Sequence, residues 1–589
     1  MRLTTHSAAV RRRPALSLVA ILAALAVLVP TAVFAAKPTA PPPVTIQLLN
    51  VSDWHGNLDP LSGVGGAWNI SARWQADRAA YPSLTLTAGD DFGATPALSN
   101  FFNEEPAVLA QRMMGIQVGA LGNHNFDRGV GHLQQMINLA GAPTSASAPG
   151  QPYQYVSANL KEHGDLSGVD PVAYFNVGGV KVAVIGITNE EAPGVVLPGA
   201  FGNVEVTDSV SAANKYAKQA RNHADVTVVI THKGVRGFNA GQPFGELIDF
   251  ANAVDPALVD VIMGDHTDTQ YAGMINGILV HENRSFGVTY AKTMLSVQPG
   301  TGKGKGSKTG SVLSKSVTFV TPTAGALTGG NTTCPASPAF CDQAIVDMLV
   351  PYRIQLAALL DGTVGTATGI FPRGGNIERR EEVATGDLIA DGMRWKYGTQ
   401  LALMNGGGIR APLPSNYAPA NTALSRPVAG YACGASPCPA PWDLVLGDIF
   451  TVLPFGNIIA TRTVTGAQIW AAMENGVSQI DSATGLSSDG RFPQISGFKF
   501  TFQYSNAPGS RVLSVALTDG TPIPNSAGAT YTMALPNFLN LGGDGYTMFG
   551  DGQGDTRDLD AVVLKEYMLA NGPVFDPTSY PLDRITKLP

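Results

Sequence analysis

Five short apolar segments in the first half of the chain each end at a junction that carries Asp, Asn or His. Longer, helix-compatible stretches separate them, which predicts strands and helices of an α/β domain. A single Asp or His after a strand is usually a turn former or a helix cap, but five such junctions in one domain indicate a shared site. Ligand sites in open α/β sheets gather outside the carboxyl ends of the strands, so we expect these side chains to face one another. The segments and their polar residues are Val44–Leu49 with Asp53 and His55, Leu84–Thr87 with Asp90, Val118–Leu121 with Asn123 and His124, Val226–Ile230 with His232, and Val261–Met263 with His266 and Asp268.

The first residues have the pattern of an export signal. Arg11–Arg13 are basic, Ala15–Val29 are apolar, and small residues at Val33 and Ala35 predict cleavage before Ala36. Residues 1–35 are therefore expected to be a signal peptide, and residues 36–43 a Pro-rich spacer. The alternative is a membrane anchor that is never cleaved. Cleavage predicts a periplasmic, cell-surface or secreted protein, with no further run of spanning length.

The length and the net charge of the chain indicate how many domains it has and which partners are excluded. The chain has 589 residues, of which 44% are hydrophobic, and this is enough for at least two domains. Its formal net charge is −7, and the signal segment carries Arg but no acid, so the exported chain is more acidic still. An acidic surface argues against a nucleic-acid polymer or an anionic membrane as partner. The oligomeric state is left open.

The four cysteines form two close pairs, Cys334 with Cys341 and Cys433 with Cys438. In an exported chain this spacing predicts two local disulfides. The alternative, a four-thiolate zinc site, lacks any C-x-x-C spacing.

The second half has binding signatures on glycine-rich loops. Three consecutive glycines let backbone approach a ligand closely, an arginine can fork onto a phosphate, and Phe rings on such loops can face a flat base. Glycine-rich loops alone are more often tight turns. The stretches are Arg379 and Arg380, Asn405–Arg410, Leu453–Asn457 with Phe455, and Asn537–Gly545 with Phe538 and Asp544.

The motifs Asp53-x-His55-Gly, Gly89-Asp90, GNHxFD at Gly122–Asp127, Thr231-His232-x-Gly and His266-Thr267 resemble those of the calcineurin-like metallophosphatase superfamily. With NGGGIR at Asn405–Arg410 and NFLxxGGDG at Asn537–Gly545, the chain resembles exported 5′-nucleotidases from about residue 44 to 570. The resemblance implies an α/β protein in which a four-layer α/β/β/α metallophosphatase domain precedes an α/β substrate-binding domain. We expect residues 44–320 to form the first domain, 321–350 a linker and 351–589 the second.

The resemblance also implies two divalent metal ions with a shared bridging carboxylate, Asp90. Oxygen and nitrogen donors without a thiolate suit Zn, Mn, Co or Fe and do not choose among them. One ion would be held by Asp53, His55, Asp90 and Asp268, and the other by Asp90, Asn123, His232 and His266.

By the same resemblance, His124 is the catalytic histidine that binds no metal, and Asp127 orients it. Phe455 and Phe538 would sandwich the base, and Asp544 would bind the ribose. The phosphate or base edge would be held by Asn405, Arg410 and one of Arg379 or Arg380.

Three departures from the family pattern concern the metals more than the reaction. Asp268 stands where His or Gln is common, and it adds negative charge. Asp265 replaces a Gly and could supply an acceptor behind the ligands. Asn125 replaces a supporting Glu.

The expected reaction is two-metal hydrolysis of nucleoside 5′-monophosphates, extending to nucleotide pyrophosphates such as UDP-sugars. A 2′,3′-cyclic phosphodiesterase/3′-nucleotidase shares both domains and is the main alternative. A catalytically idle nucleotide-binding surface protein and a sulfur-oxidation hydrolase are the others.

Overall fold

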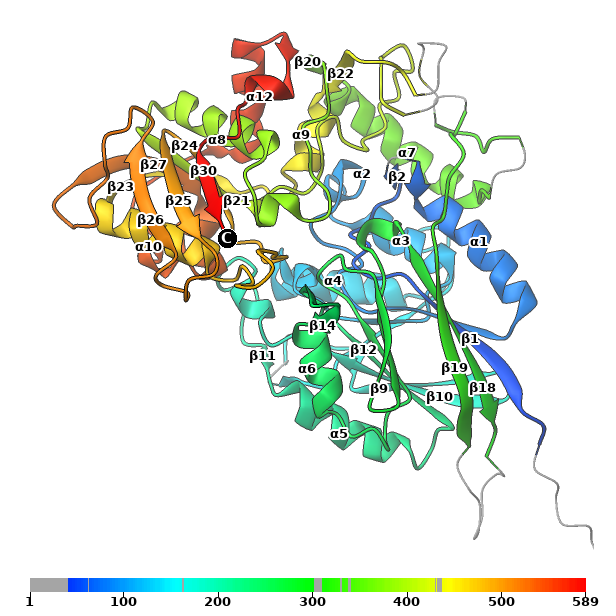
Figure 1. Cartoon of the computed structure of the whole chain (residues 1–589). Coiled ribbons are helices and arrows are strands. Elements are labelled where there is room, and N and C mark those ends of the chain that lie inside the picture. The colour runs from blue at the N-terminus through cyan, green and yellow to red at the C-terminus, as the bar shows by residue number, and fades with distance from the viewer. Residues whose placement is uncertain are drawn as a thin grey trace, which may run out of the picture. The chain divides into compact units, whose positions relative to one another are not determined.

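The computed structural model describes residues 41–589, except 62, 162–163, 301–309, 329–330, 337–339, 429–430 and 432–436. The predicted signal peptide and Cys433 lie outside the described residues. Figure 1 shows the chain with its helices and strands labelled.

Two mixed β-sheets form the centre of the first half. The first has the order β19-β18-β1-β4-β5-β6-β8, and the second has the order β16-β17-β15-β12-β10-β9. Strands β1, β4 and β5 are parallel neighbours, as are β12 and β15, so their carboxyl ends meet at one edge of each sheet. The bounds are β1 (Val44–Asn50), β4 (Ser83–Thr87), β5 (Val118–Ala120), β6 (Gln154–Val156), β8 (Val169–Asp170), β9 (Val172–Val177), β10 (Val180–Ile187), β12 (Val226–Thr231), β15 (Val261–Gly264), β16 (Tyr271–Ile275), β17 (Ile278–Glu282), β18 (Tyr290–Gln298) and β19 (Ser311–Val320).

Both faces are covered at the centre of the sheets, so that β12 and β15 are buried along their whole length, whereas the edge strands β9 and β19 keep exposed positions. Leu48 points into the core between the sheets with Val228, whereas its neighbour Leu49 packs towards the helices on the outer face. Val229 packs on the opposite side from Val228, against two further helices. The outer helices are α1 (Ala67–Ala80), α3 (Glu105–Met114) and α4 (Gly129–Gly141) on the first sheet, and α5 (Ser209–Ala220) and α6 (Glu246–Ala253) on the second. The predicted four-layer α/β/β/α arrangement is confirmed.

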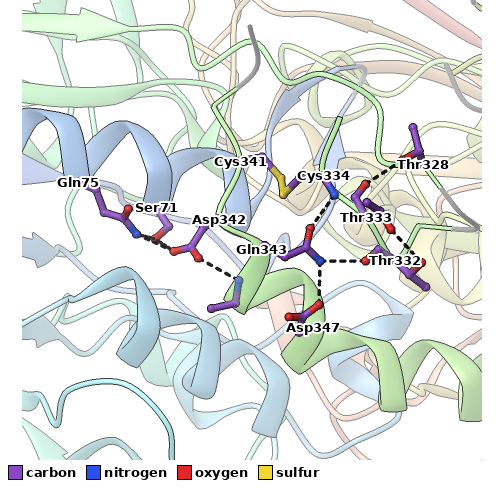
Figure 2. Close-up of a disulfide and its surroundings, with 11 residues drawn as sticks. Ser71, Gln75, Thr328, Thr332, Thr333, Cys334, Cys341, Asp342, Gln343 and Asp347 are labelled. Atoms are coloured by element: carbon purple, nitrogen blue, oxygen red, sulfur yellow. Dashed lines mark hydrogen bonds between the residues drawn. A yellow bond between two sulfur atoms is a disulfide. The ribbon is translucent and has the colours of Figure 1, made fainter. Parts of the chain in front are cut away.

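The connection to the second half contains a disulfide and a long helix. Cys334 and Cys341 are bonded, as predicted, immediately before α7 (Gln343–Leu360). Figure 2 shows how Asp342 fixes the start of this helix. Its carboxylate accepts hydrogen bonds from Ser71 on α1 and from the backbone N–H of Ala344. Since Cys433 is not described, the second pairing stays a prediction.

Helix α7 is long and apolar enough to cross a membrane by length and composition, which the sequence analysis did not anticipate. Within the described chain 33% of the helix is buried, and Ile354 and Leu359 on it are exposed. Leu349 and Leu356 are buried, and Arg353 forms an ion pair with Asp59 of the first half. The helix runs across residue 350, where the predicted linker ends.

A second α/β unit follows α7. Its five-stranded sheet has the order β24-β21-β27-β23-β28 and separates two apolar cores. Met404 packs on one face and Leu403 on the other. The bounds of its strands are β21 (Leu401–Asn405), β23 (Ile458–Thr465), β24 (Pro493–Ser496), β27 (Thr530–Pro536) and β28 (Asp555–Leu559). The helices of this unit are α8 (Ala384–Tyr397), α9 (Leu446–Val452), α10 (Gly466–Val477), α11 (Asn537–Asn540) and α12 (Asp560–Asn571). Two three-stranded sheets complete it, one of β20 (Thr363–Ala367), β22 (Trp442–Val445) and β29 (Val574–Phe575), and the other of β25 (Phe498–Gln503), β26 (Val512–Leu517) and β30 (Ile585–Leu588).

Candidate metal centre and substrate pocket

The five polar junctions converge at the carboxyl ends of β1, β4, β5, β12 and β15. Several of their residues adopt left-handed backbone conformations, which non-glycine residues rarely do. Such strain is tolerated where the surrounding structure fixes it, and it concentrates at functional sites. The left-handed residues at the site are Asp53, His55, Asp90, His266 and Asp268.

Three donor atoms from other residues gather around the side chain of His232. Its Nε2 atom lies 2.9 Å from Asp90 Oδ2, 3.0 Å from Asn123 Oδ1 and 3.1 Å from His266 Nδ1. These are the four residues that the resemblance assigns to one ion. The side chains of His232 and Asp90 are fully buried. Buried groups of this kind are normally paired or bind a metal.

Asp53 and His55 form the other end of the cluster. The Nδ1 atom of His55 donates to the carbonyl of Gly93 at 2.7 Å, so its Nε2 lone pair is free to face the cavity. That Nε2 atom lies 3.1 Å from Asp53 Oδ1 and accepts a hydrogen bond from Arg410. The geometry is that of a histidine held by a backbone carbonyl for metal binding.

The donor set fits divalent cations. His55 with Asp90, and His232 with His266 and Asp90, belong to groups whose ligand atoms lie within 4.8 Å of one another. Oδ2 of Asp90 is buried and accepts no hydrogen bond among the described residues, so an ion would satisfy it. Burial opposes the ionised form of Asp90, but His232 and His124 hold its pKa below the usual range. The carboxylate is thus ready to bridge two cations.

Asp265 and Asp268 occupy different surroundings. Asp265 Oδ2 accepts from the backbone N–H of Asp53 at 2.7 Å and lies 3.5 Å from His232 Nδ1, behind the cluster. Asp268 lines the metal cavity, yet both of its carboxylate oxygens accept hydrogen bonds from Arg284. The structure therefore brings Asp53, His55, Asp90, His266 and Asp268 to one cavity and Asn123 to the neighbouring one, and it pairs Asp268 with the guanidinium of Arg284.

His124 lies at the entrance to the metal cluster. Its Nδ1 donates to Asp127 at 3.0 Å, and its backbone N–H donates to Asp90 at 2.8 Å. The ring stacks on Phe455 at 5.4 Å and contacts the ring of His55 edge-on at 5.1 Å. Since Asp127 engages Nδ1, Nε2 is the atom available to a ligand. Asn125 supports the same loop by accepting from the N–H of Gly122 and donating to Asp91.

An open cavity of about 160 Å³ extends from the metal cluster to residues of the second half. Phe455, Phe538 and Asp544 of the second half line this cavity. Asp544 is buried and accepts from Asn405 Nδ2 at 2.8 Å. Burial, with a smaller contribution from the charge of Asp489, raises the pKa of Asp544 to about 6. One cavity thus brings together metal donors, two aromatic rings and an acceptor for hydroxyl groups.

Three arginines, Arg373, Arg379 and Arg410, lie where the metal cluster meets this cavity. Arg379 and Arg410 line both spaces, whereas Arg380 donates to the carbonyl of Gly375 and does not line the cavity. Arg373, which the sequence analysis did not single out, lines the metal cavity as well. The sequence around Arg373 gives little indication of a binding role, because an arginine followed by two glycines is common in loops. Burial and then repulsion from Arg379 and Arg373 lower the pKa of Arg410 to about 9.

Comparison with known proteins supports the resemblance seen in the motifs. Residues 363–551 match the family model of the 5′-nucleotidase C-terminal domain. A snake venom 5′-nucleotidase from Naja atra is 26% identical, over 90% of this chain and 97% of that protein. The crystal structure of a 5′-nucleotidase precursor from Thermus thermophilus is 27% identical with a TM-score of 0.72, over 92% of this chain and 99% of the other.

Other relatives are much longer. The endonuclease YhcR from Bacillus subtilis is 26% identical over 84% of this chain, which spans 37% of its length. The chain spans between about a third and two thirds of several such curated relatives. Similarity therefore covers both halves of the chain described above, but only part of these proteins.

Proposed function

We propose that this chain, which resembles the 5′-nucleotidases, hydrolyses nucleoside 5′-monophosphates to nucleoside and phosphate with the help of two divalent metal ions. The observation that carries the proposal is the single cavity that runs from the donors around His232 to Phe455 and Phe538. A nucleotide fits such a cavity, because its phosphate binds cations and its base stacks on aromatic rings. Residues 44–320 would hold the ions, and residues 351–589 the nucleoside.

Two ions would be held by the donors of the metal cluster, with Asp90 between them. When bound, such ions supply a nucleophile at neutral pH and neutralise charge on the phosphoryl oxygens. Arg379, Arg410 and Arg373 would hold the phosphate by charge-assisted hydrogen bonds. His124, oriented by Asp127, would stabilise the developing charge and hold a proton near the leaving oxygen.

Phe455 and Phe538 would stack on the base, and the ionised Asp544 would accept hydrogen bonds from ribose hydroxyls. Asn405 would act through its hydrogen bond to Asp544 and at the base edge. We extend the proposal to nucleotide pyrophosphates such as UDP-sugars, because attack at phosphorus would use the same ions. Export is also proposed, and the disulfide between Cys334 and Cys341 supports it.

The test is phosphate release from a panel of substrates. It contains 5′-AMP, 3′-AMP, 2′,3′-cyclic AMP, UDP-glucose and p-nitrophenyl phosphate, each with Zn²⁺, Mn²⁺ or Co²⁺. Preferred turnover of 5′-AMP supports the proposal, and preferred turnover of 3′-AMP and the cyclic nucleotide would replace it with a 3′-nucleotidase. Nucleotide binding without release would indicate an idle binding protein.

A further inference from the structure

The carboxylate of Asp268 lies in the wall of the metal cavity but is fully engaged by other groups. Its Oδ1 accepts from Arg284 Nε at 2.7 Å and from the backbone N–H of Ser285 at 3.0 Å. Its Oδ2 accepts from Arg284 Nη2 at 3.1 Å. A carboxylate offers about four lone-pair sites, so three donors leave little for an ion. The bidentate fork of Arg284 is also among the strongest geometries for this pair.

Arg284 is held in place by the same loop that supports Asp53. The backbone N–H of Arg284 donates to Thr289 Oγ1 at 2.9 Å. The hydroxyl of Ser285 donates to Asp53, and the N–H of Phe286 donates to the carbonyl of Asp53 at 2.8 Å. The backbone of Arg284 is therefore held beside Asp53, and its partly exposed guanidinium reaches Asp268 from there.

The charges at this end of the cluster explain why such a pair matters. Asp53 and the shared Asp90 already supply two carboxylates beside one imidazole, His55. Asp268 would add a third negative charge, and Arg284 cancels it. The guanidinium also repels any cation placed beside Asp53.

We infer that Arg284 withholds Asp268 from the ion at the Asp53–His55 end, so that this end binds its divalent ion more weakly than the end built on His232, His266 and Asn123. The inference rests on the proposed two-metal function. It predicts one firmly bound ion per chain and one that exchanges readily. Arg284 is a positioning residue, because it acts on the ion through Asp268.

The test is Mn²⁺ binding by the full exported chain, with free Mn²⁺ measured by electron paramagnetic resonance during titration. Arg284→Gln is expected to tighten the weaker site by about tenfold or more, the scale on which groups behind the ligands change metal affinity. Asp268→Asn in the wild-type background is expected to weaken this site, because it leaves the charge of Arg284 without its partner. Combined with Arg284→Gln, it should abolish the gain.

Arg221→Gln is the matched control. Arg221 forms an ion pair with Asp260 at 2.8 Å with similar partial burial, but neither residue lines the metal cavity. This variant should bind Mn²⁺ as the wild type does. Arg284→Lys keeps the charge but loses the fork, so it should fall between the wild type and Arg284→Gln. Thermal melts followed by circular dichroism establish that each variant is folded.

Unchanged or weaker binding in folded Arg284→Gln would overturn the inference. Loss of the weaker ion in the double variant Arg284→Gln, Asp268→Asn would overturn it too, because with both charges removed such a loss would mean that Asp268 is already a ligand in the wild type. Phosphate release is measured separately. A chain that shows these binding changes but does not hydrolyse 5′-AMP would overturn only the proposed function, whereas hydrolysis without the binding changes would overturn only the inference.

Discussion

Arg410 is expected to stabilise the transition state of the reaction while lowering the free energy of unfolding of the protein. Burial and then the neighbouring Arg379 and Arg373 lower its pKa from the ordinary range of arginine to about 9. A shift of this size corresponds to roughly 5 kcal/mol against the charged guanidinium, taken as an upper limit. Because the lowered pKa still lies above neutral pH, the group is charged at pH 7 and the whole cost is present there. The cost declines only as the pH rises through about 9.

Arg410→Gln removes this charge and keeps a polar, although shorter, side chain. We expect the free energy of unfolding to rise by about 1–2 kcal/mol, since active-site groups commonly cost stability. The value of kcat/KM for 5′-AMP should fall by about 10- to 100-fold, as one charge-assisted hydrogen bond contributes about 1.5–3 kcal/mol. Denaturant unfolding without phosphate and steady-state kinetics measure the two effects.

Arg426→Gln is the control for a buried arginine that has a partner. Arg426 is fully buried, and the carboxylate of Asp448 accepts hydrogen bonds from both of its terminal amino groups, at 2.6 and 2.7 Å. Leaving Asp448 unpaired should destabilise the fold by about 3–5 kcal/mol. If Arg410→Gln also unfolds more easily than the wild type, the argument from repulsion among the three arginines is refuted.

Three further changes probe the other parts of the site. His124→Ala should lower kcat by about 10²- to 10⁴-fold while metal content stays unchanged by mass spectrometry; a parallel loss of metal would make His124 a ligand. Phe538→Ala should raise KM for 5′-AMP by about tenfold but leave p-nitrophenyl phosphate unaffected, and equal effects on both would remove the stacking role. Because the pKa of Asp544 is about 6, the ratio of kcat/KM for 5′-AMP to that for p-nitrophenyl phosphate should rise as the pH increases through 6. Asp544→Asn should flatten that ratio, and an unchanged profile would exclude Asp544 as the titrating group.

The convergence of the five junctions could be predicted from the sequence because it follows from strand direction. Parallel neighbours such as β1 and β4 place their carboxyl ends at the same edge, whatever the loops do afterwards. The four-layer arrangement was implied by the motifs and is confirmed. Apolar runs such as Val226–Ile230 fit it because both faces of the sheet are covered.

The partners of individual side chains could not be predicted in the same way. Asp268 meets Arg284 across a hairpin of two strands, and nothing in the spacing of 16 residues indicates that their side chains meet. Arg373 reaches the metal cavity through the packing of the second half against the first. Arg379 and Arg380 are adjacent in sequence, and only the backbone conformation of their turn separates their directions.

The most direct measurement of the central claim is phosphate release from 5′-AMP by the exported chain after dialysis against a chelator. The account predicts that activity is lost with the ions, returns on addition of Mn²⁺ or Zn²⁺, and reaches its maximum at two ions per chain. Release that is insensitive to the chelator, or absent with two ions bound, would contradict it.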